Sequence, residues 1–156
     1  MQFERLIFCG GSAYVNSMNI DTDTAARLTA AIDLDPAHVR SALDELGRYM
    51  HAHPGVAEPK AGSRTTLQIG KTLCPEMDGA DPGTAYRARQ AAGWRLWSAC
   101  VDAGILIAIS CTSATGRRMP GYALATDSHL DGCPKAEMQA LGKTRKAAAR
   151  EAAKAR

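Results

Sequence analysis

Basic side chains at helical spacing late in the sequence are the residues best suited to a chemical task, the binding of phosphate. Lys143, Lys146, Arg150 and Lys154 follow one another at intervals of three, four and four residues. On a helix this spacing gathers the four cations on one face, where they can neutralise the phosphates of a nucleic acid. Residues 134–156 contain seven basic and two acidic residues, a net charge of +5. We expect a basic arm that lies along nucleic acid or an acidic partner surface, and the alternative is a solvated, fraying terminal helix.

Seven further residues are candidates for contact with phosphates or bases. They are Arg40, Ser41, Arg48, Lys60, Arg64, Arg117 and Arg118. The first three share a predicted helix, and the other four lie in two predicted turns, where basic side chains suit a phosphate backbone. Asp44 and Glu45 in the same helix oppose such contact. For this helix, nucleic-acid recognition, a structural role and a protein-contact surface therefore remain close to even.

Histidine and cysteine side chains are the residues that could hold a metal. His129 and Cys133 are four residues apart, and His51 and His53 form a second pair. The sequence has no Cys-x-x-Cys pair, and no two half-sites have the spacing of a structural zinc site. The spacing of residues in the sequence does not support a Ser/His/Asp, Cys/His or paired-carboxylate catalytic arrangement. We expect no metal site, no catalytic residues and no cofactor.

Two short motifs bear on enzyme chemistry. The segment from Arg118 to Ala123 has the Arg-x-x-Gly-x-Ala pattern and resembles, over six residues, the pyrophosphate-binding motif of GNAT-family acetyltransferases. In that family the motif joins a strand to a long helix, whereas the residues after Ala123 have little helical character. Gly10-Gly11-Ser12 could cradle a phosphate but lacks the lysine of a phosphate-binding loop, so a turn is favoured. A GNAT-like acetyltransferase is the third function that we consider.

The elements that position these residues begin with helices. After a strand expected over residues 2–9 and a short helix over 12–20, the pattern predicts helices over 23–32 and 36–50. Asp35 is the expected cap of the longer helix, with Pro36 at its first position. The spacing of apolar residues then changes from that of a helix to that of two strands, over 56–58 and 65–69. This change predicts a β-hairpin with a basic tip at 59–64.

A helix, a tight turn, a second helix and a basic-tipped hairpin together resemble the winged helix-turn-helix superfamily. The resemblance covers about a third of the chain, from residue 23 to residue 69. It implies that the 36–50 helix is the recognition helix and that the hairpin is a wing on the phosphate backbone. The expected fold class is α+β and winged-helix-like, with helices, two β-hairpins and a C-terminal basic helix.

The second half of the chain loosely repeats this order of elements. A helix is predicted over 84–103, with Gly104 as a left-handed cap. A strand over 105–112, with Ile107 in the core, a basic turn and a returning strand over 121–125 follow. A polar loop precedes the helix expected from residue 135 onwards, and Trp94 and Trp97 are expected in the core. We expect a winged-helix-like unit at 1–72, a helix plus β-hairpin unit packed on it at 73–133, and a basic helical tail at 134–156.

Composition indicates a globular protein of a reducing compartment. Hydrophobic residues make up 46% of the 156 residues, and the five cysteines are an odd number without a framework spacing. No apolar run is long enough for a signal-peptide core or a membrane span. We expect a cytoplasmic protein with no membrane partner.

The leading hypothesis is a non-enzymatic nucleic-acid-binding protein, with DNA favoured over RNA. It would be a small DNA-binding regulator, or a replication or partition accessory of a mobile element. The alternative is a protein-binding module or inhibitor that docks on a nucleic-acid-handling machine. Residues 1–58 favour the alternative, because their four basic and eight acidic residues give a net charge of −4. Formation of a homodimer is left open.

Overall fold

The computed structural model describes residues 20–60 and 62–156 of the chain. The expected strand over 2–9, the Gly10-Gly11 turn and the helix over 12–20 lie outside these residues, Ile20 excepted. The described chain is α+β, with five α-helices, two 3-10 helices and one two-stranded antiparallel sheet. It divides into two units. The helical unit contains residues 20–46 and 59–105, and the hairpin unit contains residues 47–58 and 106–156. Each unit thus draws on separate parts of the chain, whereas three consecutive segments were expected.

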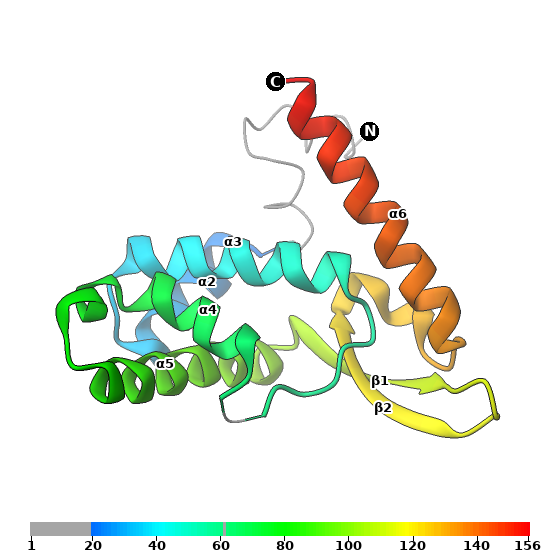
Figure 1. Ribbon diagram of the computed structural model, residues 1–156, viewed down its shortest axis with the longest axis horizontal. Coiled ribbons are helices and arrows are strands. Elements are labelled where there is room, and N and C mark those ends of the chain that lie inside the picture. The colour runs from blue at the N-terminus through cyan, green and yellow to red at the C-terminus, as the bar shows by residue number, and fades with distance from the viewer. Residues whose placement is uncertain (1–19, 61) are drawn as a thin grey trace. The chain divides into compact units, whose positions relative to one another are not determined.

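The helical unit is built from four α-helices and a short 3-10 helix. They are α2 (Thr22–Ile32), the first part of α3 (Pro36–Ala52), α4 (Arg64–Leu73), η2 (Pro75–Gly79) and α5 (Pro82–Asp102). Figure 1 shows α4 lying along α5. The core of this unit is mostly aliphatic, with one tryptophan. Its most deeply buried side chains include Ile32, Val39, Leu46, Leu73, Leu96, Trp97 and Cys100.

Aspartate caps fix the first two helices close to where the sequence predicts them. The amide of Thr24 donates to Asp21 at 2.6 Å, and the amide of Ala37 donates to Asp35 at 2.8 Å. Each carboxylate therefore satisfies one of the amides that a helix start leaves without a partner. The helices expected over 23–32 and 36–50 are confirmed as α2 and α3.

The predicted wing is wrong, because residues 65–69 belong to helix α4 rather than to a strand. Ser63 caps this helix: the amide of Thr66 donates to its Oγ at 3.3 Å, and Oγ1 of Thr66 donates to its carbonyl at 2.9 Å. Thr66 and Leu73 are both buried, two helical turns apart on the inner face of α4. Burial of this face outweighs the strand preference of the threonine pair. The described residues of 56–69, all but residue 61, form no hairpin, and a winged-helix fold is not confirmed.

Helix α5 is the predicted helix of the second half, with an earlier start. Asp81 is its cap, because the amide of Thr84 donates to this carboxylate at 3.1 Å, so the helix begins two residues before the predicted position. Gly104 follows the helix with the left-handed φ of 75° that was expected of it. Trp97 is buried as predicted, whereas Trp94 is 39% exposed and the prediction for it is wrong. The two tryptophans, three residues apart, are therefore not both on the buried face.

The hairpin unit contains the only sheet of the described residues. Strands β1 (Leu106–Thr112) and β2 (Arg118–Leu124) pair antiparallel, with Ile109 opposite Gly121. The predicted hairpin is confirmed, although β2 begins three residues earlier than expected. Ile109 is buried, whereas Ile107 is only partly buried and packs at the edge of the core. The core continues through the 3-10 helix η3 (Ala125–Leu130), where a polar loop was predicted.

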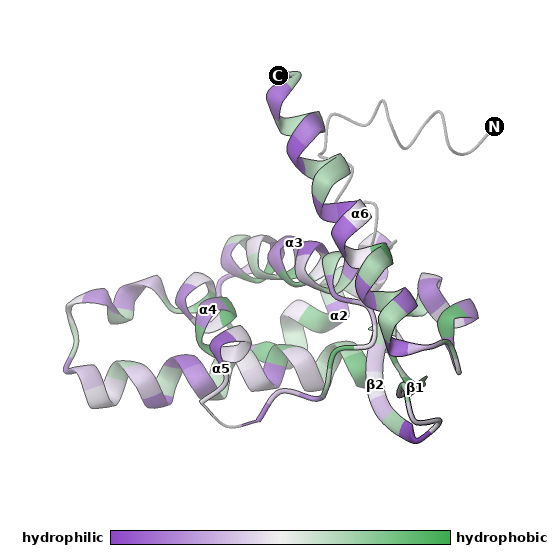
Figure 2. Ribbon diagram, turned by 45° about the vertical axis from the view of Figure 1, so that its right-hand side comes forward, coloured by the Kyte–Doolittle hydropathy of each residue, from purple (hydrophilic) through white to green (hydrophobic). Residues whose placement is uncertain are grey.

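Helix α6 (Lys135–Lys154) confirms the helix expected from residue 135. The chain before it is tied to β1, because the amide of Thr112 donates to the carbonyl of Cys133 at 3.0 Å and that of Gly132 to Ser110 at 2.7 Å. Met138 in its first turn is buried in the hairpin-unit core. Figure 1 shows α6 starting beside the hairpin and leading away from it, and Figure 2 shows hydrophilic and hydrophobic segments alternating along it. Within residues 20–60 and 62–156, no helix has both the length and the apolar character that a membrane span requires.

Candidate anion-binding site

One side of α6 carries a row of basic residues. Lys135, Lys143, Lys146, Arg150 and Lys154 are all exposed, and we call them the α6 basic face. Successive residues turn by about 100° around a helix, so these five positions and that of Gln139 fall within a sector of roughly 100°. The two acidic residues of the helix, Glu137 and Glu151, lie outside this sector. Only Lys154 is paired, through an exposed contact of 3.3 Å with Glu151.

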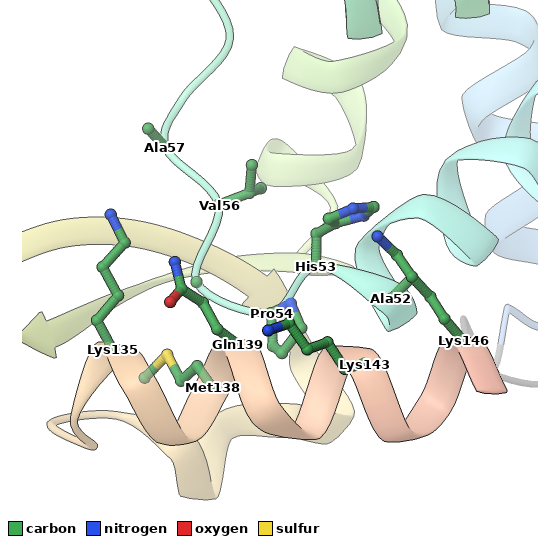
Figure 3. A pocket seen from close by; sticks show the side chains of 11 residues that line it. Ala52, His53, Pro54, Val56, Ala57, Lys135, Met138, Gln139, Lys143 and Lys146 are labelled. Carbon is green, nitrogen blue, oxygen red and sulfur yellow. The ribbon is translucent and has the colours of Figure 1, made fainter. Parts of the chain in front are cut away.

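The first half of the α6 basic face borders a cavity of about 480 Å³, which we call the α6 cavity. Its far wall is formed by residues 52–57, and no carboxylate is among the residues that line it. The near wall is α6 itself. Figure 3 shows Lys135 and Lys146 rising from the two ends of this stretch of α6, with Gln139 and Lys143 between them. The apolar part of the lining includes Pro54, Val56 and Met138. The site therefore combines three cations with an apolar surface and has positive charge only.

The wall formed by residues 52–57 is held as an extra edge of the sheet. The amide of Gly55 donates to the carbonyl of Tyr122 at 2.9 Å, and the amide of Tyr122 donates to the carbonyl of Val56 at 2.7 Å. These two hydrogen bonds pair Val56 with β2 in an antiparallel bridge. Pro54 is buried beside them. Because both walls are fixed to the same sheet, the cavity is a feature of the folded unit and not of a mobile tail.

Helix α6 closely approaches Ala52 at the end of α3, which is one of the residues that line the cavity. Gly142 is buried on α6, and a β-carbon at this position would overlap the carbonyl oxygen of Ala52. Only glycine allows the two backbones to come this near. Gly142 therefore allows α6 to lie close to Ala52, and Lys143 and Lys146, one and four residues further along the helix, line the cavity.

His53 is a further polar group of this wall. Its ring stacks on the ring of Tyr49 with 4.4 Å between centroids, and its Nδ1 lies 2.9 Å from the carbonyl oxygen of Tyr49. A carbonyl oxygen can only accept a hydrogen bond, so Nδ1 carries the hydrogen. The stack and this bond orient the imidazole, which is part of the cavity lining.

The opposite face of α6 is fixed by a buried ion pair. Arg145 makes two parallel hydrogen bonds to Asp127, from Nη1 at 2.9 Å and from Nη2 at 2.8 Å. The Asp127 side chain is 5% exposed and that of Arg145 is 17% exposed. Nη1 of Arg145 also donates to the carbonyl of His51 at 3.1 Å, near the end of α3. This pair connects α6 both to η3 and to α3, so it holds the helix in a defined rotation with its basic face towards the cavity.

The half-buried His51 side chain makes the stability of this region sensitive to pH. Burial lowers the pKa of His51 below its ordinary value of 6.5, the Arg145 guanidinium lowers it further, and Asp127 opposes this shift. The folded protein thus binds the His51 proton more weakly than the unfolded chain does. The free energy of unfolding of this region is therefore at its full value above pH 6.5, and it decreases as the pH falls below 6.5 and the unfolded chain binds the proton.

We expect the hairpin unit to be less stable at pH 5.5 than at pH 7.5, and His51→Gln to remove part of this difference. Hydrogen exchange of the β1 and β2 amides at the two pH values, corrected for intrinsic rates, measures the change. His129→Gln is the control, because His129 is exposed on η3. The interpretation fails if the His51→Gln protein keeps the full pH dependence of the unmodified chain.

The comparisons with known proteins give no family for this site. No family model, curated protein or solved structure matches the chain. Function is therefore argued from the geometry of the described residues.

The predicted binding residues separate into several groups in the structure. Lys143, Lys146, Arg150 and Lys154 share the α6 basic face as predicted, and the first two line the cavity. Arg117 and Arg118 are exposed at the β1–β2 turn of the same unit. The other five do not form one surface, because Arg48 belongs to the hairpin unit and the remaining four belong to the helical unit. These five residues, all exposed, are Arg40, Ser41, Arg48, Lys60 and Arg64.

Two predicted roles change with the structure. Lys60 and Arg64 precede and begin α4, so they do not flank the tip of a wing. The Arg118 to Ala123 motif lies wholly within β2 and is followed by a 3-10 helix, so it does not form the strand-to-helix junction of a GNAT acetyltransferase. Among the described residues, no three His, Cys, Asp or Glu side chains gather where they could share a metal ion.

Sequence reasoning missed Lys135, Gln139 and His53 as members of the site. The sequence held a signal for the first two. Lys135 and Gln139 precede Lys143 at intervals of four residues, so they continue the basic stripe towards the start of the helix. His53 gave no such signal. It reaches α6 only because the chain between them forms the hairpin and returns.

Proposed function

We propose that this chain is a non-enzymatic nucleic-acid-binding protein that contacts phosphates through the α6 basic face. The observation that carries the proposal is five exposed cations in one helical sector without an intervening carboxylate. Residues 135–154 span about 28 Å of helix axis at ~1.5 Å per residue, and duplex DNA carries one negative charge per roughly 1.7 Å. A straight row of cations of this length can meet several phosphates at once. We propose duplex DNA as the target, because its backbone is a similarly regular row of charges.

Helix α3 is less suited to this contact than α6. Arg40, Asp44 and Arg48 follow at four-residue intervals, so a carboxylate separates the two arginines on one face of the helix. Glu45 is half-buried and accepts a hydrogen bond of 2.6 Å from Thr72 of α4, which gives it a structural role. Binding through α6 requires no winged helix. Helix α4 occupies the residues where the wing was expected.

A reducing compartment such as the cytoplasm is part of the proposal. The four cysteines within the described residues, Cys74, Cys100, Cys111 and Cys133, are free thiols. Burial raises the pKa of Cys100 to about 12, so this thiol stays protonated at neutral pH and serves as a small core side chain. Free buried thiols are typical of proteins from reducing compartments.

Replacing Lys143, Lys146 and Arg150 with glutamine is expected to weaken binding to a 20-base-pair duplex by at least tenfold at 50 mM salt. Each lost phosphate contact also lowers the slope of log K against log salt by about 0.9, so the slope should fall by roughly 2–3. Fluorescence anisotropy at several salt concentrations measures both quantities. The control replaces Arg40, Arg48 and Arg64 with glutamine, which removes the same net charge elsewhere.

Equal losses in the two triple variants would show that only total charge matters and would contradict a defined interface. Retention of a protein partner from nuclease-treated lysate, without duplex binding, would instead support docking on a nucleic-acid-handling protein. Truncation after Leu141 is not a clean test. It would remove Arg145 and leave the buried Asp127 carboxylate without its guanidinium.

A further inference from the structure

The α6 cavity is better matched to a compact, highly charged anion than to a single backbone phosphate. Lys135, Lys143 and Lys146 place up to three positive charges around one cavity of about 480 Å³. A backbone phosphodiester carries one negative charge, whereas a phosphate monoester carries about −1.5 to −2 at pH 7. A terminal phosphate or a diphosphate therefore balances the cations more fully than an internal phosphate of a strand.

The polar groups of the cavity are chemically selective for such an anion. A lysine ammonium has three donors and no acceptor, and the Gln139 amide adds two donors. No carboxylate of the described residues lines the cavity to repel the ligand or to bind a cation instead. The apolar part of the lining, which includes Pro54 and Val56, offers a surface for the sugar or base that carries the phosphate. The volume also lies in the range of small-ligand sites, about 300–1,000 Å³.

We infer that the α6 cavity binds a terminal phosphoryl group, that is, a phosphate monoester or a diphosphate on a nucleoside. Two sources share this chemistry: the 5′-phosphate end of a nucleic acid strand and a free nucleotide. For the strand end the inference rests on the proposed function, because the remaining cations of the α6 basic face then hold the adjoining backbone. Arg150 and Lys154 lie on the same face beyond the cavity, so a strand whose end enters the cavity can continue along the helix.

Gln139→Glu is the variant that addresses the cavity alone. It keeps the size of the side chain and places a negative charge among the three lysines. Residue 139 is exposed on α6, so the substitution should change the stability of the fold little. Gln68→Glu is the matched control, because Gln68 is exposed on α4 in the helical unit. Both proteins have the same net charge, so any difference between them is local.

The experiment measures binding of the full chain to duplexes that differ only in a 5′-phosphate or a 5′-hydroxyl, and titrates ADP and pyrophosphate by calorimetry at constant ionic strength. We expect the 5′-phosphate to tighten binding by about fivefold in the unmodified protein and in Gln68→Glu, and to have no effect in Gln139→Glu. ADP binding that Gln139→Glu abolishes, without a 5′-phosphate effect, supports the cavity with a free nucleotide as the source.

Two results separate the cavity from the wider interface. If no duplex binds but ADP or pyrophosphate binds in a Gln139-dependent way, the proposed function fails and the cavity assignment stands. If duplexes bind with normal salt dependence, but neither the 5′-phosphate nor the free anions distinguish Gln139→Glu from Gln68→Glu, the cavity assignment is overturned and the proposed function stands.

Discussion

Gly93→Ala is expected to destabilise the helical unit by about 3 kcal/mol. Gly93 is buried on α5, and a β-carbon there would overlap the backbone carbonyl of Thr66 on α4. Gly70 on α4 makes the reciprocal contact, because its β-carbon would overlap the carbonyl of Arg89 on α5. Each glycine thus faces backbone that cannot rotate away, so an added methyl group must push the two helices apart. Loss of the packing around Trp97 on the same helix should accompany this separation.

Urea unfolding followed by tryptophan fluorescence measures this change, since both tryptophans belong to the helical unit. Gly79→Ala is the control, because no atom lies within 4 Å of a β-carbon at that position and the residue is exposed in η2. This control should be neutral, or slightly more stable through the smaller entropy of its unfolded chain. A Gly93→Ala protein as stable as Gly79→Ala would show that α4 and α5 do not cross at this distance.

The error at α4 shows what a local sequence pattern leaves undecided. Thr65-Thr66-Leu67-Gln68-Ile69 has strand-forming residues, and over five residues its period is ambiguous. The helical signal needs a longer stretch, since Thr66, Ile69, Gly70 and Leu73 recur at intervals of three, one and three residues. The decisive contact is the approach to Gly93, more than twenty residues later in the chain. Tertiary packing against α5 therefore determines that residues 64–73 are helical.

Helices that have a capping residue and an apolar stripe in their own sequence could be predicted, whereas the candidate site could be predicted only in part. The spacing of Lys143, Lys146, Arg150 and Lys154 placed them on one face because helix geometry alone brings them together. The second wall of the cavity comes from residues 52–57, about eighty residues earlier, and no local pattern relates it to α6. The same holds for Asp127, whose burial follows from a partner that only the folded chain supplies.

Arg145→Met is expected to cost about 3–5 kcal/mol in the stability of the hairpin unit, because it leaves the Asp127 carboxylate buried without a positive partner. Asp127→Leu should cost less. The Arg145 side chain is 17% exposed and can turn its charge to water, whereas the Asp127 side chain is 5% exposed and cannot. The double variant Asp127→Leu/Arg145→Met removes both charges and should recover most of the loss, since replacing a whole buried pair by apolar groups is often close to neutral.

Hydrogen exchange of the β1 and β2 amides across this double-mutant cycle gives the coupling energy between the two side chains. Lys154→Gln is the matched control, because its exposed contact with Glu151 should contribute at most about 1 kcal/mol. Because the Asp127 and Arg145 side chains are only 5% and 17% exposed, their coupling energy should exceed that of any surface pair on α6. Additive effects of the two substitutions would mean that Asp127 and Arg145 do not act as a pair. In that case α6 would be oriented by packing of residues such as Met138, Leu141 and Gly142, and the rotation that turns its basic face to the cavity would not depend on this ion pair.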